Sequence, residues 1–125
     1  MDASELLHPD TYLHESEGRL AVDVAEIGDA LVITSTIAGA KPEDIAVFID
    51  NDVLTIRGKR EKEISVAQDD YYFQECYWGA FSRSIILPID VRTGEAEATF
   101  KNGVLTVLIP KETSSKRVPI VVVDE

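Results

Sequence analysis

The side chains best suited to nucleophilic or metal chemistry are not spaced in a way that would form a site. His8 and His14 lie near the start of the chain, and the single cysteine, Cys76, follows far downstream. A catalytic cysteine needs a base beside it, and a metal ion needs several ligands at suitable spacing. We therefore interpret the histidines as solvent-exposed and Cys76 as a small buried or interface residue. The sequence predicts no enzyme, no cofactor and no metal site.

The charge and composition of the chain exclude several classes of partner. The 125 residues carry a formal net charge of −11, which repels phosphate backbones and argues against nucleic acid. No apolar run reaches the length that crosses a membrane, and the first twenty residues lack the basic and apolar regions of a secretory signal. One cysteine cannot form an intramolecular disulfide and fits a reducing compartment. We therefore expect a soluble, cytoplasmic protein.

The stretch 98–110 predicts a β-hairpin closed by Asn102-Gly103. Asn-Gly is well suited to a two-residue type I′ turn, because both positions need a positive φ. With this turn Phe100 faces Leu105, and Pro110 ends the second strand because it lacks an N–H for the ladder. Alternation then places one set of apolar side chains on a single face, namely Ala96, Ala98, Phe100, Leu105, Val107 and Ile109.

Upstream stretches also alternate apolar and polar residues, as strands with one buried face do. They are marked by Leu20, Val22 and Val24, by Leu31 to Ile37, by Ile45, Val47 and Ile49, by Leu54 and Ile56, and by Phe81 to Leu87. A turn at Asn51-Asp52 would pair the third stretch with the fourth, and Gly58 is expected to end that hairpin. About seven short strands with regular turns predict an all-β fold, an antiparallel β-sandwich.

The segment between Gly58 and Gly79 has a different character. It opens with a run of charges and then carries aromatic residues at Tyr71-Tyr72-Phe73 and Tyr77-Trp78. A connection this long inside a compact domain is uncommon unless it is functional or disordered, and its aromatic content argues against plain disorder. We interpret it as an extended segment that reaches another surface, most simply that of another subunit.

Arg83 falls on the apolar register of the strand that follows. A half-buried guanidinium needs a carboxylate or carbonyl partner, and the alternative is an edge position with its head group in water. Beyond Lys111 a polar linker leads to the apolar run Val118-Pro119-Ile120-Val121-Val122-Val123, which needs a surface on which to dock. This run is either an anchoring segment or a last strand of the same sandwich, and we favour the anchor.

Four motifs, in order, resemble the small heat shock protein (alpha-crystallin domain) family, bacterial type. They are the hairpin from Asp44-Ile45 to Gly58, the strand Gly79-x-Phe81-x-Arg83-x-Ile85-x-Leu87-Pro88, the hairpin from Ala98 through Asn102-Gly103 to Pro110, and the tripeptide Val118-Pro119-Ile120. The resemblance covers about Leu20 to Val121. It implies an immunoglobulin-like β-sandwich and an ATP-independent holdase that binds unfolding proteins and assembles as oligomers built from dimers.

The resemblance also implies which residues meet partners. In the bacterial type, the loop strand pairs with the first strand of the other subunit. The dimer interface would then comprise Leu20, Val22, Val24, Tyr71, Tyr72, Phe73, Glu75 and Arg83. The tail anchor Val118-Pro119-Ile120 would dock in a groove formed by Ile45, Val47, Ile49, Ala96, Ala98 and Phe100.

The resemblance divides the chain into an N-terminal arm (1–18), a sandwich (19–111) and a tail (112–125). Two features depart from the family pattern: Cys76 stands where an arginine is usual after Glu75, and the arm before the sandwich is short and polar. The alternative is a monomeric β-sandwich interaction module, or a co-chaperone without holdase activity. Such a module needs neither the aromatic loop nor the tail, so these two segments discriminate between the two functions.

Overall fold

A computed structural model describes residues 18–112 and 118–124 of the chain. No helix among these residues is long and apolar enough to cross a membrane. They form short 3-10 helices η1 (Gln68–Asp70) and η2 (Thr93–Glu95). The strands are β1 (Gly18–Arg19), β2 (Val22–Ile27), β3 (Ala30–Thr36), β4 (Ala40–Asp50), β5 (Val53–Arg60), β6 (Gly79–Ile86), β7 (Glu97–Lys101) and β8 (Val104–Pro110).

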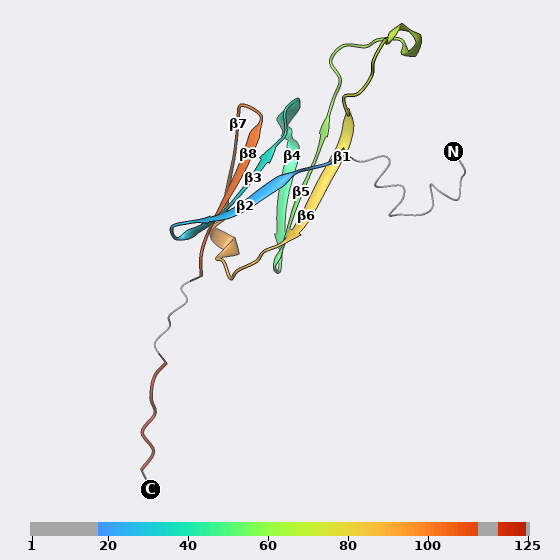
Figure 1. The fold of residues 1–125 in the computed structure, drawn as a ribbon. Helices are drawn as coiled ribbons and strands as arrows, with labels where there is room; N and C mark the ends of the chain where they lie inside the picture. Colours follow the sequence, from blue (N-terminus) through green and yellow to red (C-terminus); the bar gives the residue numbers. More distant parts are fainter. Residues whose placement is uncertain (1–17, 113–117, 125) are drawn as a thin grey trace, which may run out of the picture.

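The strands build two four-stranded sheets that pack as a sandwich (Figure 1). One sheet has the order β1-β6-β5-β4 and the other β2-β3-β8-β7. Neighbours are antiparallel except β1 and β6, where Gly18 pairs with Phe81 and Arg19 with Ser82 in parallel. The predicted all-β sandwich is therefore confirmed, with β1 added as a short parallel strand that the sequence pattern did not indicate.

The core lies between the inner faces of the two sheets. Its buried apolar side chains are Leu20, Leu31, Ile33, Ile37, Leu54, Ile56, Phe81, Leu87, Leu105, Val107 and Ile109. Ser35 is the buried polar residue of the described ranges, and its Oγ donates a hydrogen bond of 2.9 Å to the carbonyl oxygen of Ala21. That bond offsets the desolvation of the hydroxyl, so the alternating pattern of β3 tolerates a serine on its inner face.

Both predicted hairpins form with the predicted register. Asn102 and Gly103 have φ angles of 53° and 78°, as a type I′ turn requires. Phe100 pairs with Leu105 across this turn. In the β4–β5 hairpin Ile49 pairs with Leu54, and Val47 pairs with Ile56.

The prediction that Gly58 ends its strand is wrong, since β5 continues to Arg60. Gly58 lies within the ladder and pairs with Phe81, whose ring occupies the space beside it. A Cβ built on Gly58 would lie 2.5 Å from Cζ of Phe81 and 2.6 Å from the carbonyl oxygen of Asp44. The glycine therefore marks a close approach inside a strand.

Two strand starts also differ from the sequence pattern. β4 begins at Ala40, and an irregular register between Ala40 and Ile45 accommodates Pro42 at the sheet edge. β2 begins at Val22, so Leu20 precedes the strand and lies in the core with 2% of its surface exposed. Neither shift moves an apolar side chain to the opposite face.

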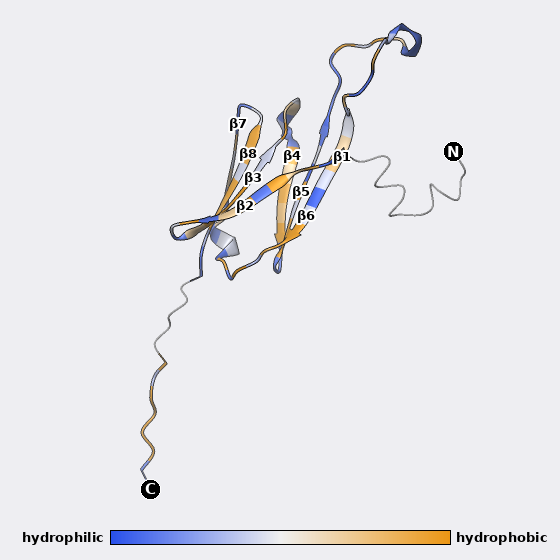
Figure 2. Ribbon diagram, in the orientation of Figure 1, coloured by the Kyte–Doolittle hydropathy of each residue, from blue (hydrophilic) through white to orange (hydrophobic). Residues whose placement is uncertain are grey.

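Three strands leave backbone edges available at the borders of the sheets. β4 and β7 are the last strands of their respective sheets, and β2 closes the other border of its sheet. β6 is covered on one side only by the two residues of β1. The loop between β5 and β6 extends from the sandwich, and the segment 118–124 lies away from both sheets (Figure 1). Figure 2 shows that this last segment is strongly hydrophobic.

Candidate interaction surfaces

The loop between β5 and β6 is held in shape by contacts between its two arms. The Lys62 ammonium lies 4.2 Å from the centre of the Tyr71 ring, which is cation–π geometry. Gln68 Nε2 donates a hydrogen bond of 2.7 Å to Oε1 of Gln74 across the loop. The hydroxyl of Tyr71 is buried and has no hydrogen-bond partner within the described residues. These contacts order the loop without covering its aromatic tip.

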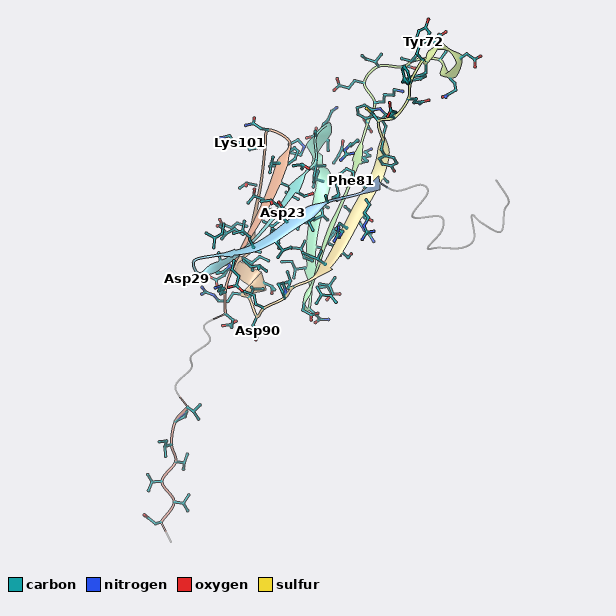
Figure 3. All side chains as sticks on the ribbon, in the orientation of Figure 1. Asp23, Asp29, Tyr72, Phe81, Asp90 and Lys101 are labelled. Carbon is teal, nitrogen blue, oxygen red and sulfur yellow. The ribbon has the colours of Figure 1, made fainter. Side chains whose placement is uncertain are left out.

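The tip of the loop presents aromatic side chains to solvent. Tyr72 is 98% exposed and Phe73 83% exposed, and Figure 3 shows Tyr72 at the far end of the loop. Glu75 and Cys76 are exposed as well, so Cys76 is not a core residue of the single chain. Large aromatic groups left in water on an ordered loop form a surface that a partner can bury.

Two cationic side chains and a hollow lie where the loop joins the sheet. The Arg60 guanidinium sits 5.4 Å from the ring centre of Phe81. The Lys59 ammonium donates to the Glu61 carboxylate at 2.9 Å; this hydrogen bond and the lysine charge lower the pKa of Glu61. A hollow of about 500 Å³ beside them has apolar walls formed by Ile64, Val66, Tyr71 and Trp78.

Arg83, which lies on β6, is hydrogen-bonded to Leu20, another residue of the predicted dimer interface. Its Nη1 donates a hydrogen bond of 2.9 Å to the carbonyl oxygen of Leu20. The half-buried guanidinium thus has the carbonyl partner that one of the two sequence interpretations required. On the neighbouring edge strand β2, Val22 is half-buried and Val24 is 40% exposed. The edge of β2 therefore presents one partly covered and one exposed valine.

The predicted groove residues lie on the edge strand β4 and on or just before the edge strand β7. We call this set the edge seam: Ile45, Val47, Ile49, Ala96, Ala98 and Phe100. All are half-buried except Ala98, which is exposed, and most pack against the core cluster. Ala96 immediately precedes β7 rather than pairing in it. Five of the six residues thus pack against the shared core, and all six keep some surface in water.

The tail residues 118–124 form no strand in the structure. Val118 is 79% exposed and Ile120 90% exposed, and the next three valines are exposed to a similar degree. This segment is therefore not a last strand of the sandwich in this structure. Both histidines and residues 113–117 lie outside the described residues.

Sequence reasoning did not find the contacts of Trp78, Arg60 and Lys62. The Trp78 ring packs beside Gly39, with Cζ3 at 3.5 Å from the position of a Cβ there. These residues meet through the bend at the start of β4 and through the loop, so no period in the sequence connects them. The sequence signal was the glycine at position 39 itself, since its φ of 89° in the structure is one that favours glycine.

Two sheets with these strand orders form an immunoglobulin-like sandwich. An aromatic loop projects from it, and an exposed apolar tail follows it in the chain. The fold matches solved small heat shock proteins. A structure from Xylella fastidiosa superposes with a TM-score of 0.75 at 28% identity, covering 87% of this chain and all (100%) of that one. Heat shock protein 16.0 from Schizosaccharomyces pombe gives 0.70 at 31% identity, covering 86% and 100%.

The Hsp20/alpha crystallin family matches residues 23–123, and the chain belongs to this family. Small heat shock protein C2 from Rickettsia felis is 34% identical over 94 residues, which cover 75% of this chain and 61% of that protein. The 17.6 kDa class I heat shock protein 1 from Arabidopsis thaliana is 38% identical over 105 residues, covering 82% of this chain and 68% of that protein. The chain thus spans 61% of the Rickettsia relative's length.

Proposed function

We propose that the protein is an ATP-independent holdase, a chaperone that binds unfolding proteins and keeps them from aggregating. Its working unit is a homodimer formed by strand exchange, which assembles further into a higher homo-oligomer. It uses no cofactor, catalyses no reaction, binds neither nucleic acid nor membranes, and acts in the cytoplasm. Membership of the small heat shock protein family supports the chaperone role, and a single cysteine suits a reducing compartment.

One observation carries this proposal: the sandwich completes its core, yet its apolar loop tip and tail remain in water. Phe73 is 83% exposed and Ile120 90% exposed, while the core residues Ile33 and Ile56 are 0% exposed. Exposed apolar surface of this kind is a cost to a protein that works alone, and it favours association with other chains. A monomeric module would have no use for either segment.

The loop supplies the strand for exchange. Tyr71 to Gln74 lie outside any strand of the described chain, and the backbone at Tyr71 is extended. The border of β2 beyond Val22 and Val24 has no neighbouring strand among the described residues. Pairing the loop of one copy with β2 of the other would complete both ladders and cover Tyr72 or Phe73. Glu75 and Arg83 lie at the ends of this proposed interface.

The tail supplies the contact between dimers. In an extended segment Val118 and Ile120 point to the same side, about 7 Å apart, and we propose that they insert into the edge seam of another copy. Burying each side chain would contribute about 1.5–3 kcal/mol before the entropy of docking is subtracted. Pro119 lowers that entropy by stiffening the segment. Such a contact is reversible, so heating can release the seam for an unfolding client.

This assignment divides the chain into an arm (1–18), the sandwich (19–111) and a tail (112–125). It is tested by two measurements on the full chain: its mass by light scattering, and the aggregation of a heat-labile client without ATP. We expect a dimer or larger species and a fall in client scattering at equimolar subunits. A monomer with no protective effect would contradict the proposal and favour the interaction module.

A further inference from the structure

The two ends of the edge seam lie at opposite ends of the sandwich. At one end, the turn between β4 and β5 meets the segment before β7, since Asp52, Thr93 and Glu112 line one hollow of about 270 Å³. At the other end, the turn between β7 and β8 meets the link into β4, where the N–H of Ile37 donates to the Gly103 carbonyl at 2.6 Å. β7 therefore runs from the first end to the second. Figure 3 shows Asp90 and Lys101 at these opposite ends.

The two ends differ in charge. The first, which we call the acidic end, carries the exposed carboxylates Asp50, Asp52, Asp90 and Glu112. Within the described ranges none of these four makes an ion pair, because the nearby Arg92 is bound to Glu95 at 3.1 Å and Lys111 to Glu26 at 2.8 Å. The second end carries Lys41 and Lys101 together with Glu43 and Asp44, four charges that cancel, and so lacks the excess of carboxylates of the first.

The tail has the complementary distribution of charge. Lys116-Arg117 directly precede its aliphatic run, and Asp124-Glu125 follow that run. We propose that these flanking charges fix the direction in which the tail of a second copy docks on the edge seam, with Lys116-Arg117 at the acidic end and the tail parallel to β7. The inference rests on the proposed tail docking and adds a direction to it.

The reverse direction would bring Asp124-Glu125 against four carboxylates and leave the basic pair beside a balanced end. Each exposed charge pair contributes modestly, and salt screens it. Several pairs acting together would favour one direction roughly fivefold at low salt. The aliphatic contacts of Val118 and Ile120 set whether the tail binds, whereas the charged flanks set which way it lies.

Disulfide cross-linking between two different cysteine variants tests the direction of docking. Both variants also carry Cys76→Ser, so that the native cysteine cannot react. One chain carries either Ser115→Cys or Val123→Cys in its tail, and the other carries either Thr93→Cys at the acidic end or Ala38→Cys at the opposite end. None of these substitutions removes a charge. We expect the pairs 115 with 93 and 123 with 38 to form roughly five times more disulfide than the two reversed pairs.

The combined variant Lys116→Glu, Arg117→Glu and Asp124→Lys is expected to reverse that ratio, and about 1 M salt should bring it near one. Equal yields at low salt, or an excess of the reversed pairs, would overturn the direction while leaving tail docking intact. Yields no higher than with Ser84→Cys, on the outer face of β6, would instead contradict the docking itself. The two failures are therefore distinguishable.

Discussion

Replacing Gly58 with alanine tests whether the close approach of β5 to Phe81 determines the packing of the sandwich. The new methyl carbon would lie 2.5 Å and 2.8 Å from two atoms of the Phe81 ring and 2.6 Å from the Asp44 carbonyl oxygen. Carbon atoms pack at about 3.5–4.0 Å, so a neighbour must move by about 1 Å. Phe81 is only 1% exposed, so its ring is enclosed by other groups of the core.

The expected cost follows from this geometry. Forcing a methyl group into a well-packed core destabilises by about 1–3 kcal/mol, and the backbone contact with Asp44 places Gly58→Ala toward the upper part of that range. Gly94→Ala is the matched control, because a Cβ there meets nothing within 4 Å and its φ is not positive. That change should leave stability unchanged or raise it by up to about 1 kcal/mol.

Urea unfolding, followed by the fluorescence of the single tryptophan, Trp78, measures both variants. Protein concentration is held constant, because association adds to apparent stability. We expect a lower midpoint for Gly58→Ala with an unchanged slope. If the two alanine variants unfold at the same urea concentration, the steric account of Gly58 is wrong.

Three further changes address the contacts between chains and the link to β6. Val118→Ala with Ile120→Ala should reduce assembly above the dimer, measured by light scattering, because the side chains proposed to fill the edge seam are lost. Deleting residues 68–74 should give monomers by the same measurement, since the exchanged strand is removed. Arg83→Met should lower the free energy of unfolding by about 1–2 kcal/mol, because the Leu20 carbonyl loses its charged donor.

Each of these changes has a control or an outcome that contradicts it. Val121→Ala with Val123→Ala removes similar area from the opposite side of the tail, and an equal effect of both pairs would refute the proposed facing. Dimers that persist after the loop deletion would refute strand exchange. An Arg83→Met protein as stable as the unaltered protein would refute the contribution of this hydrogen bond, and an Arg83→Lys protein as stable as the unaltered one would indicate that the planar guanidinium is not needed at the Leu20 carbonyl.

The hairpins were predictable because their information is local. Asn102-Gly103 adopts the positive φ angles that only a few residue types accept readily, and this turn fixes the pairing of Phe100 with Leu105. Strict alternation then assigns the inner face, so Ile45, Val47 and Ile49 were correctly placed on one strand. The same logic placed Arg83 on the apolar register, where it has a carbonyl partner.

The features that were missed depend on distant segments. Gly58 resembled a strand end because nothing in its neighbourhood indicates that Phe81 fills the space beside it. The contact of Lys62 with Tyr71 depends on how the loop folds back, and the parallel pairing of Gly18 with Phe81 has no periodic pattern. Surfaces that bind partners are harder still to predict, because the structure of a single chain shows which residues are exposed but not what covers them.

Hydrogen exchange at the backbone amides of Tyr72, Phe73 and Gln74 tests strand exchange most directly. No strand of the described chain includes these residues, and their amides make no backbone hydrogen bond within it. A strand paired on one side donates from every second residue, so strand exchange predicts that alternate amides in this stretch and along the border of β2 are protected in the assembled protein and lose protection when dimers dissociate. Unprotected exchange at all of these amides in a stable dimer would contradict the account.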